Sequence, residues 1–319
     1  MLRALATISL VMLACARDES SRLERASTQQ QTLAAEPTKA PPSRAGMPPQ
    51  DAEYVELALA LDPEATLRIL TVGRVELPLV DRPTAFAREE DLAFDGCSGD
   101  GFARTCTVHH RYGRFEAEPP AGKILETDAH RFDGVTSHHT IDATGARIGT
   151  TTVEGPLGPP PFADTELGQA LVDVHRFACL RFPAEKVAVG AKWNDECRFV
   201  LGGVVVKQNV AWELSALDAD PSSGQRAELT MVGELVAPHP AGERRGTIRG
   251  HLYWFVEHKA PHILRLETKL PLDPAKPPVT KTILNLQFAR VLADGTLVRT
   301  DGQPLEPAAR GVATPPSDR

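Results

Sequence analysis

Histidines are the residues of this sequence whose type and spacing come closest to a chemical site. Two adjacent pairs flank a single histidine, in the order His109, His110, His130, His138 and His139. Imidazole is a common zinc ligand and a general acid or base near neutral pH. Neighbouring residues in a strand point to opposite faces, so a metal site needs one histidine from each pair and a further ligand. The alternative is that they are surface or half-buried side chains.

No other cluster forms a catalytic motif. Ser98 lies in a Gly-rich loop but lacks the G-x-S-x-G turn of a nucleophilic serine. The acidic residues Glu185, Asp195 and Glu196 are typical of exposed charges, although paired carboxylates can perform acid–base work. We therefore expect a non-catalytic protein without a cofactor. A metalloenzyme or hydrolase built on the histidines is the remaining enzymatic alternative.

The N-terminus resembles the signal peptide of bacterial lipoproteins. Residues 1–14 hold one basic residue, Arg3, and a short apolar run, and they end as Met-Leu-Ala before Cys15. The resemblance implies that Cys15 is acylated and becomes the new N-terminus, whereas ordinary secretion or an uncleaved leader are the alternatives. Ala16 after the cysteine implies sorting to the outer membrane. We thus expect the chain to contact a membrane through its N-terminal lipid.

The remaining four cysteines predict disulfide bonds, because an even number in an exported chain is typical of them. Three pairings are open, and the pairing of sequence neighbours is favoured: Cys97 with Cys106, and Cys179 with Cys197. A zinc site built on cysteines is disfavoured because C-x-x-C spacings are absent.

Composition separates a folded body from two loose ends. Residues 15–50 are rich in Ser, Gln and Pro and predict a disordered tether, and residues 301–319 predict a flexible tail. The net charge of −7 and the isoelectric point near 5.8 argue against nucleic acid as a partner.

Short segments with a period of two dominate the body and predict antiparallel strands. The N-terminal β-rich half covers residues 51–161, and Tyr54–Leu61 at its start is expected to be a strand, with a short helix as the alternative. Proline residues in 155–161 break the chain. The second half, residues 162–300, begins with a predicted helix at about 164–180, whose apolar stripe must pack on a sheet.

The expected fold is thus mainly β: one or more curved antiparallel sheets, or a partly open barrel, in two β-rich halves with the helix packed on it. In the second half, residues 204–288 predict successive hairpins, and an Asp-Gly turn at 294–295 predicts a last small hairpin.

The junction between the halves carries a family resemblance. Phe182, Pro183, Val187, Val189, Gly190 and Trp193 fit the pattern F-P-x-E-x-V-x-V-G-x-x-W that follows the predicted helix. The order of helix, this pattern and long hairpins resembles a family of uncharacterised bacterial envelope lipoproteins. The resemblance covers about residues 167–292 and implies fold and location, but no chemistry.

These observations together predict a lipid-anchored lipoprotein of the bacterial outer membrane. Because a curved sheet covered by a helix can leave an apolar cavity, we expect it to bind a lipid, another apolar ligand or an envelope component. The alternative is a structural lipoprotein that contacts an envelope protein partner and contains no cavity.

Overall fold

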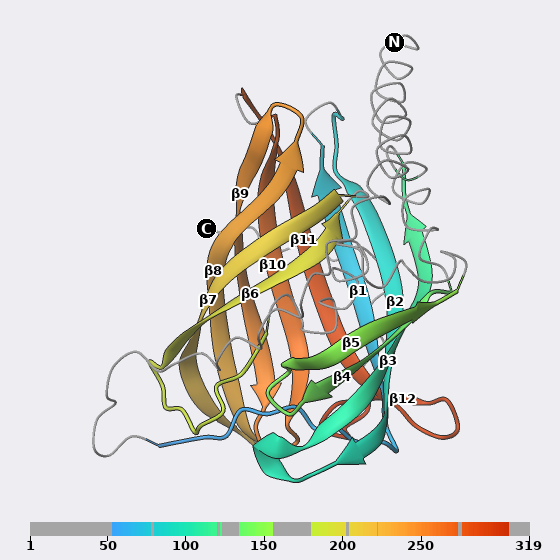
Figure 1. Ribbon diagram of the computed structural model, residues 1–319, viewed down its shortest axis with the longest axis vertical. Coiled ribbons are helices and arrows are strands. Elements are labelled where there is room, and N and C mark those ends of the chain that lie inside the picture. The colour runs from blue at the N-terminus through green and yellow to red at the C-terminus, as the bar shows by residue number, and fades with distance from the viewer. Residues whose placement is uncertain are drawn as a thin grey trace. The chain divides into compact units, whose positions relative to one another are not determined.

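The computed structural model describes residues 53–77, 80–119, 122, 134–155, 180–201, 204–221, 223–273 and 276–305. These residues form one antiparallel sheet of twelve strands (Figure 1). The strands are β1 (Thr66–Glu76), β2 (Thr84–Ser98), β3 (Thr105–Ala117), β4 (Thr136–Asp142), β5 (Arg147–Glu154), β6 (Lys192–Leu201), β7 (Val204–Asp220), β8 (Gly224–His239), β9 (Gly242–Phe255), β10 (Ala260–Asp273), β11 (Lys276–Val291) and β12 (Leu297–Arg299). A 3₁₀ turn, Gly101–Ala103, joins β2 to β3. The prediction of a mainly β, antiparallel fold is confirmed.

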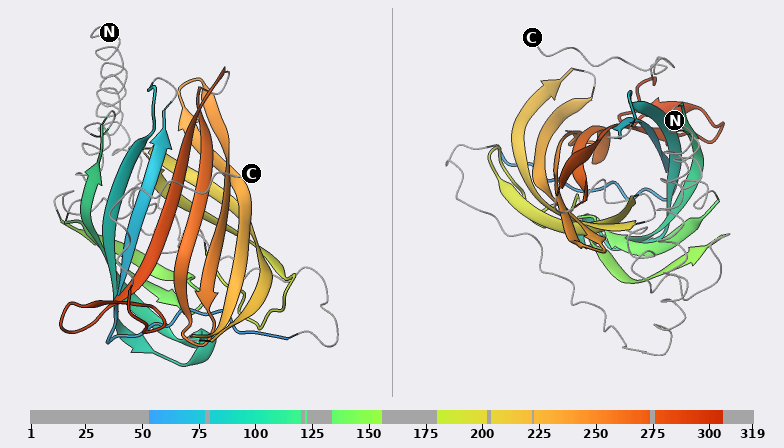
Figure 2. Two further views of the ribbon diagram at one scale, coloured as in Figure 1. Left: turned by 180° about the vertical axis from the view of Figure 1, so that it is seen from behind. Right: turned by 90° about the horizontal axis from the view of Figure 1, so that it is seen from above.

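The two halves of the sequence join in a single sheet. Its strand order is β5-β4-β3-β2-β1-β11-β10-β9-β8-β7-β6, with β12 paired to β11. Every neighbouring pair on this path is consecutive in sequence except β1 and β11, whose pairing runs from Thr66 with Val291 to Glu76 with Lys281. Strands β5 and β6 are its edges, so the sheet is open. Figure 2 shows that it curves strongly across its width.

Alternating burial gives the sheet an inner face, which carries the core, and an outer face. The predicted alternation in the second half is confirmed, with the same face of β7 to β11 buried: Val206, Val210, Trp212, Leu214, Leu229, Met231, Leu235, Ile248, Leu252, Trp254, Leu264, Leu266, Leu270 and Phe288. Burial of each such side chain contributes about 1.5 to 3 kcal/mol. These residues form one continuous core with the inner face of β1 to β4.

Residues 53–65 lie across one end of this core. Within this segment Val55 makes a strand-like bridge, to Val187, and residues 63 and 64 lie in a turn. Further along, the Leu59 amide donates to the Ala143 carbonyl at 2.7 Å and the Ala60 amide donates to the Lys259 carbonyl at 2.7 Å. The expectation of a sheet strand at Tyr54–Leu61 is therefore wrong, because its backbone bonds to three separate segments instead of one neighbouring strand.

The junction between the two halves packs into the core. The Phe182 ring packs edge-on against Trp254 with centroids 4.6 Å apart, and its amide donates to the Thr144 carbonyl at 2.9 Å. Gly190 has φ = +87°, which favours glycine, and its turn leads into β6, where Trp193 is 2 % exposed. The predicted helix at 164–180 lies outside the described residues, except for Leu180, which is not helical.

The Cys97–Cys106 disulfide is present and joins β2 to β3. Cys197 is also disulfide-bonded, and Cys179, its predicted partner, lies outside the described residues. So do the leader, Cys15, the tether and residues 306–319. Within the described ranges, no helix has the length and apolar character needed to cross a membrane.

Candidate functional site

The two histidine pairs lie side by side on neighbouring strands. In the β3–β4 register, His109 stands opposite His138, and His110 stands opposite Ser137. Strand alternation therefore separates each pair, with His109 and His138 on the outer face and His110 and His139 on the inner face, where they are 0 % and 2 % exposed. The structure thus groups the histidines by face and not by sequence pair. His130 lies outside the described residues.

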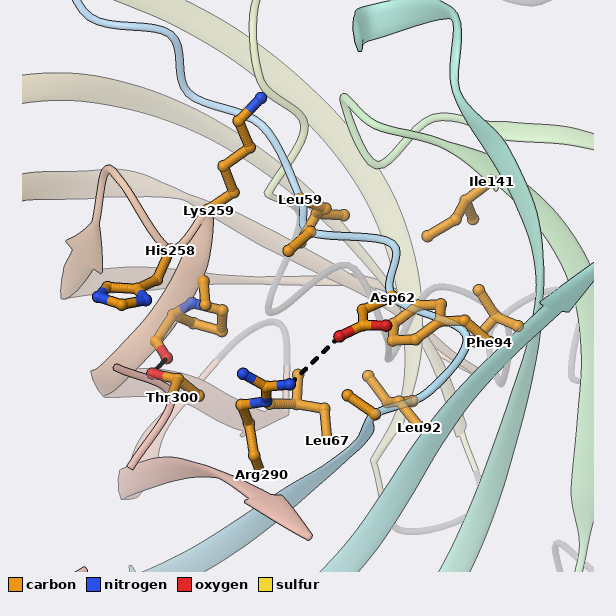
Figure 3. Close-up of a pocket in the computed structure, with 15 residues that line it drawn as sticks. Leu59, Asp62, Leu67, Leu92, Phe94, Ile141, His258, Lys259, Arg290 and Thr300 are labelled. Carbon is orange, nitrogen blue, oxygen red and sulfur yellow. Dashed lines mark hydrogen bonds and ion pairs between the residues drawn. The ribbon is translucent and has the colours of Figure 1, made fainter. Parts of the chain in front are cut away.

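The inner face contains a cavity of about 80 Å³ at the end of the sheet that residues 53–65 cross. One wall is apolar and comes from four strands and the crossing segment (Figure 3): Leu59, Leu67, Leu92, Phe94, Val108 and Ile141. The other lining residues include the polar side chains of Asp62, His258, Lys259, Arg290 and Thr300 (Figure 3). This volume is well below the roughly 300 to 1,000 Å³ of sites for drug-sized ligands, so it fits only a small group or a chain end.

The charged groups beside the cavity are already paired. Arg290 Nη2 donates to Asp62 Oδ2 at 3.2 Å, and Lys259 Nζ donates to Glu56 Oε1 at 2.6 Å. The Thr300 hydroxyl donates to the Pro261 carbonyl at 2.6 Å. Since these cations have carboxylate partners, they hold the crossing segment to β11 and to the β9–β10 turn. The main contacts that the cavity offers to a ligand are therefore apolar.

Polar side chains occupy the same face further along β2, β3 and β4. Two residues beyond the apolar wall, the face carries Glu90, His110 and His139, and after these Arg88, Tyr112 and Ser137. We call these six residues the polar band. Two strand residues span about 6.6 to 6.8 Å, so the change from apolar to polar is abrupt. Glu90, Tyr112 and Ser137 are at most 5 % exposed.

Glu90 is the charged centre of the polar band. Its Oε1 lies 3.3 Å from Arg88 Nε and 3.5 Å from His110 Nε2, which are ion-pair contacts without hydrogen-bond geometry. Burial acts to raise the pKa of Glu90, but the Arg88 charge and then His110 outweigh it and lower the pKa to about 2. Arg88 also stacks on the Tyr112 ring, with its guanidinium carbon 4.4 Å from the centroid. Glu90 is thus ionised inside the protein.

Burial shifts the pKa of two further groups. It lowers the pKa of His139 to about 3, and electrostatic interactions with His110 and Arg147 add to the effect, so the ring is neutral at physiological pH. Burial and the nearby Glu90 charge raise the pKa of the Tyr112 hydroxyl, which remains protonated. The band therefore combines the Glu90 carboxylate and the Arg88 guanidinium with the uncharged side chains of Tyr112, His139 and Ser137.

Several polar atoms of the band lack a hydrogen bond. Among the described residues, neither the Ser137 hydroxyl nor Nδ1 of His110 has a partner, although both side chains are 0 % exposed. An unpaired buried polar group costs about 1 to 3 kcal/mol, so such groups in a folded protein call for a specific reason. Ser137, His110 and Glu90 belong to the residue types of an acyl-transfer triad, but no hydrogen bond joins Ser137 to His110. As arranged, the groups can bind a polar group.

On the outer face, four side chains form a line across β2, β3, β4 and β5. His109 Nε2 lies 2.7 Å from Asp95 Oδ2, His109 Nδ1 lies 2.6 Å from His138 Nδ1, and His138 Nε2 lies 3.4 Å from Glu154 Oε2. The two rings are perpendicular, with centroids 4.7 Å apart. In the part of the chain that the structure describes, no group of three or more His, Cys, Asp or Glu side chains is arranged to hold a metal ion.

Sequence reasoning missed most of the polar band. It identified His110 and His139 but not Arg88 or Glu90, because no strand was predicted at β2. It did not single out Tyr112 or Ser137 either. The signal was present in the β2 sequence TAFAREEDLAFDGCS, where Arg88 and Glu90 occupy the positions that alternate with Leu92 and Phe94. Charged residues on the apolar face of a strand are unusual and mark a site to inspect.

The other candidates have ordinary surroundings. The Ser98 hydroxyl forms a hydrogen bond with the Thr105 hydroxyl at 3.2 Å, next to the disulfide loop. Glu185 is exposed, and Glu196 lies 3.0 Å from Lys207 on the neighbouring strand. These contacts agree with surface charges.

Comparisons with known proteins show little similarity. No protein-family model matches the sequence, and no curated protein matches it significantly. One similar solved structure is DynF from the dynemicin biosynthesis pathway of Micromonospora chersina, with 11 % identity over 86 % of this chain and 93 % of that chain, at a TM-score of 0.23. A TM-score this low supports no inference about fold or function.

Proposed function

We propose that this protein is a non-catalytic, lipid-anchored lipoprotein of the bacterial outer membrane that binds an amphiphilic molecule on the inner face of its sheet. One observation carries the proposal: Leu92 lines an apolar cavity, and its neighbours across the paired strands β3 and β4, His110 and Ser137, hold buried polar atoms that have no partner among the described residues. A ligand with an apolar end and a hydrogen-bonding group would contact both.

The apolar end of the ligand belongs in the cavity. Leu92, Phe94 and Val108 are at most 8 % exposed and leave space between them and Leu59. At about 80 Å³ the cavity takes the end of an acyl or isoprenoid chain, and removal of this end from water favours binding by about 25 cal/mol per Å².

The polar group of the ligand belongs beside the polar band. His110 Nδ1 can accept or donate a hydrogen bond according to its tautomer, and the Ser137 hydroxyl can do both. Glu90 is ionised and favours a donor over an anion. We therefore infer a ligand whose polar group is a hydroxyl, an amide or an amine, about 7 Å from the apolar end.

The N-terminal features fit this proposal. A lipidated Cys15 and a flexible tether would hold the sheet close to a membrane, where amphiphiles are found. The predicted helix at 164–180 would cover the inner face of the partly open, curved sheet, and the resemblance to envelope lipoproteins agrees with such an arrangement. The alternative is a lipoprotein that contacts an envelope protein partner and binds no ligand. The test below distinguishes it from the proposed function.

The test is a binding titration of the full chain with a fluorescent long-chain alcohol. Val108→Phe fills the cavity and is expected to weaken binding at least tenfold. Val232→Phe is the matched control, because Val232 is 62 % exposed on the outer face. Thermal unfolding of both variants verifies that they fold. Equal binding by wild type and Val108→Phe, or no binding by wild type, would contradict the proposal.

A further inference from the structure

The crossing segment, residues 53–65, forms part of the cavity wall without being a strand of the sheet. Leu59, Ala60, Asp62 and Ala65 line the cavity (Figure 3). A strand such as β9 pairs residue by residue with β8 on one side and β10 on the other. The crossing segment instead depends on a few separate contacts. Part of it can therefore move while the sheet stays intact.

Both ends of the crossing segment are fixed. At its start, the Val55 amide donates to the Val187 carbonyl at 2.8 Å and the Val187 amide donates to the Val55 carbonyl at 2.9 Å. Near its end, Arg104 Nε, from the loop between β2 and β3, donates to the Leu61 carbonyl at 3.0 Å. Residues 56–60 lie between these two attachments and are the part that can move on its own.

Polar contacts to two other segments hold residues 56–60 in place. The Leu59 amide donates to the Ala143 carbonyl and the Ala60 amide donates to the Lys259 carbonyl, both at 2.7 Å. Lys259 Nζ also donates to Glu56 Oε1 at 2.6 Å, and we call this ion pair the latch. The two side chains of the latch are 40 % and 30 % exposed, so solvent screens their attraction. The latch is thus a contact that breaks at low cost.

Lys259 holds the crossing segment from the turn between β9 and β10. Its φ of +48° is the one positive value among the non-glycine residues in the described ranges. This left-handed conformation is unfavourable for a residue with a Cβ and persists where the surrounding structure requires it. In it, the Lys259 carbonyl binds Ala60 and the ammonium binds Glu56, and the residue also lines the cavity. The group that closes the crossing segment is therefore part of the cavity wall.

Residues 56–60 separate the cavity from solvent. Leu57 and Leu59 are 0 % and 8 % exposed and belong to the core, whereas Ala60 is exposed. Burial of the two leucines favours the closed arrangement. Outward movement of these residues exposes them and opens the cavity at this end of the sheet.

We propose that residues 56–60 open and close the end of the cavity, and that the latch determines how often they open. The inference rests on the proposed function in one respect, because the opening admits the apolar end of the amphiphile. The opening itself is a property of the protein without ligand, so it can be measured separately.

Amide hydrogen exchange of the full chain tests the opening without a ligand. The Leu59 and Ala60 amides should be less protected than the Val55 amide, because residues 56–60 open while the Val55–Val187 bridge stays closed. Glu56→Gln should lower the protection of Leu59 and Ala60 by about two- to fivefold, the size expected for loss of an exposed ion pair, and leave Val55 unchanged.

Stopped-flow mixing with the fluorescent long-chain alcohol tests the connection to binding. Glu56→Gln should raise the association and dissociation rate constants by the same factor, about two- to fivefold, and leave Kd unchanged. A merely structural role of Glu56 would instead weaken Kd without faster association.

The matched control is Glu213→Gln. Glu213 Oε2 lies 3.0 Å from Lys192 Nζ in another partly exposed ion pair, but that pair joins β6 to β7. This variant should change neither the protection of Leu59 and Ala60 nor the two rate constants. Thermal unfolding of both variants verifies that they fold.

Two results would overturn the proposal. One is equal protection of Leu59, Ala60 and Val55 in the wild type. The other is an effect of Glu56→Gln on the two rate constants that is no larger than the effect of Glu213→Gln. If the wild type binds no alcohol while Leu59 and Ala60 are less protected than Val55, the proposed function is wrong and the opening of residues 56–60 stands.

Discussion

The inner and outer faces of β3 and β4 place the same residue type in opposite environments. His110 and His139 on the inner face are buried among Glu90, Arg88 and Tyr112, whereas His109 and His138 on the outer face are partly exposed between Asp95 and Glu154. One residue of displacement along a strand separates the two environments. The comparison shows that two adjacent histidines in a strand belong to two different sites, one on each face, and that the neighbouring strands supply the other residues of each site.

Replacement of the buried carboxylate is expected to have the largest effect. Glu90→Gln leaves Arg88 and His110 next to a neutral group, and we expect a loss of about 3 kcal/mol in the free energy of unfolding at pH 7. The pKa of Glu90 is about 2 in the folded protein, against an ordinary value of 4.5 for a glutamate side chain. As pH falls from about 4.5 to 2, the unfolded chain takes up this proton first, so the wild type loses stability there and the variant loses less. Urea unfolding of both chains across this range is the measurement.

His139 should contribute the second largest pH effect. Its folded pKa of about 3 lies below the ordinary 6.5, so between these values the unfolded chain binds one more proton than the folded chain. Stability must therefore fall as pH falls, by about 2 kcal/mol between pH 7 and pH 5 from this group. We expect the difference in unfolding free energy between wild type and His139→Gln to change by this amount over the range. A constant difference would show that the pKa of His139 is the same in the folded and the unfolded chain.

Ser137 provides a smaller test of the unpartnered atoms. Ser137→Ala removes a buried hydroxyl without a hydrogen bond among the described residues, and we expect it to raise the free energy of unfolding by about 1 kcal/mol. The matched control is Ser215→Ala, because the Ser215 hydroxyl donates to the Glu228 carbonyl at 3.0 Å, and its loss should destabilise by about 1 kcal/mol. Chemical denaturation measures both. Ser137→Ala should also weaken amphiphile binding. Higher stability together with weaker binding would show that the Ser137 hydroxyl binds the ligand, whereas higher stability alone would indicate a packing defect.

The smallest effect is expected on the outer face. The Glu154 side chain is 75 % exposed, and its Oε2 lies 3.4 Å from His138 Nε2. Glu154→Gln should therefore change the free energy of unfolding by less than about 0.5 kcal/mol, as for most exposed ion pairs. A loss as large as that of Glu90→Gln would show that the two faces do not differ in the way described.

Local patterns in the sequence predicted much of the fold. The alternation of Val206, Val210 and Trp212, and of their equivalents in β8 to β11, determined which face is buried, and the turn at 294–295 predicted the β11–β12 hairpin. The Cys97–Cys106 bond followed from proximity in sequence. These features depend on neighbouring residues, which a sequence displays directly.

Features that depend on distant residues could not be predicted in this way. The pairing of β1 with β11 joins residues more than two hundred positions apart, and nothing in either strand specifies the other. The segment 53–65 alternates like a strand, but its partners, Val187, Ala143 and Lys259, come from three places. The polar band has the same origin, since Glu90, His110 and Ser137 meet only after β2, β3 and β4 pair.

The most direct test of the account is photochemical labelling of the full chain with a long-chain alcohol that carries a diazirine at the end of its chain. The account predicts that mass spectrometry finds the label on the cavity wall of β2 to β4, at Leu92, Phe94, Val108 or Ile141. It also predicts that Val108→Phe removes this label and Val232→Phe does not. Labelling confined to the outer face, or labelling of the wall that Val108→Phe leaves unchanged, would contradict binding at the inner face.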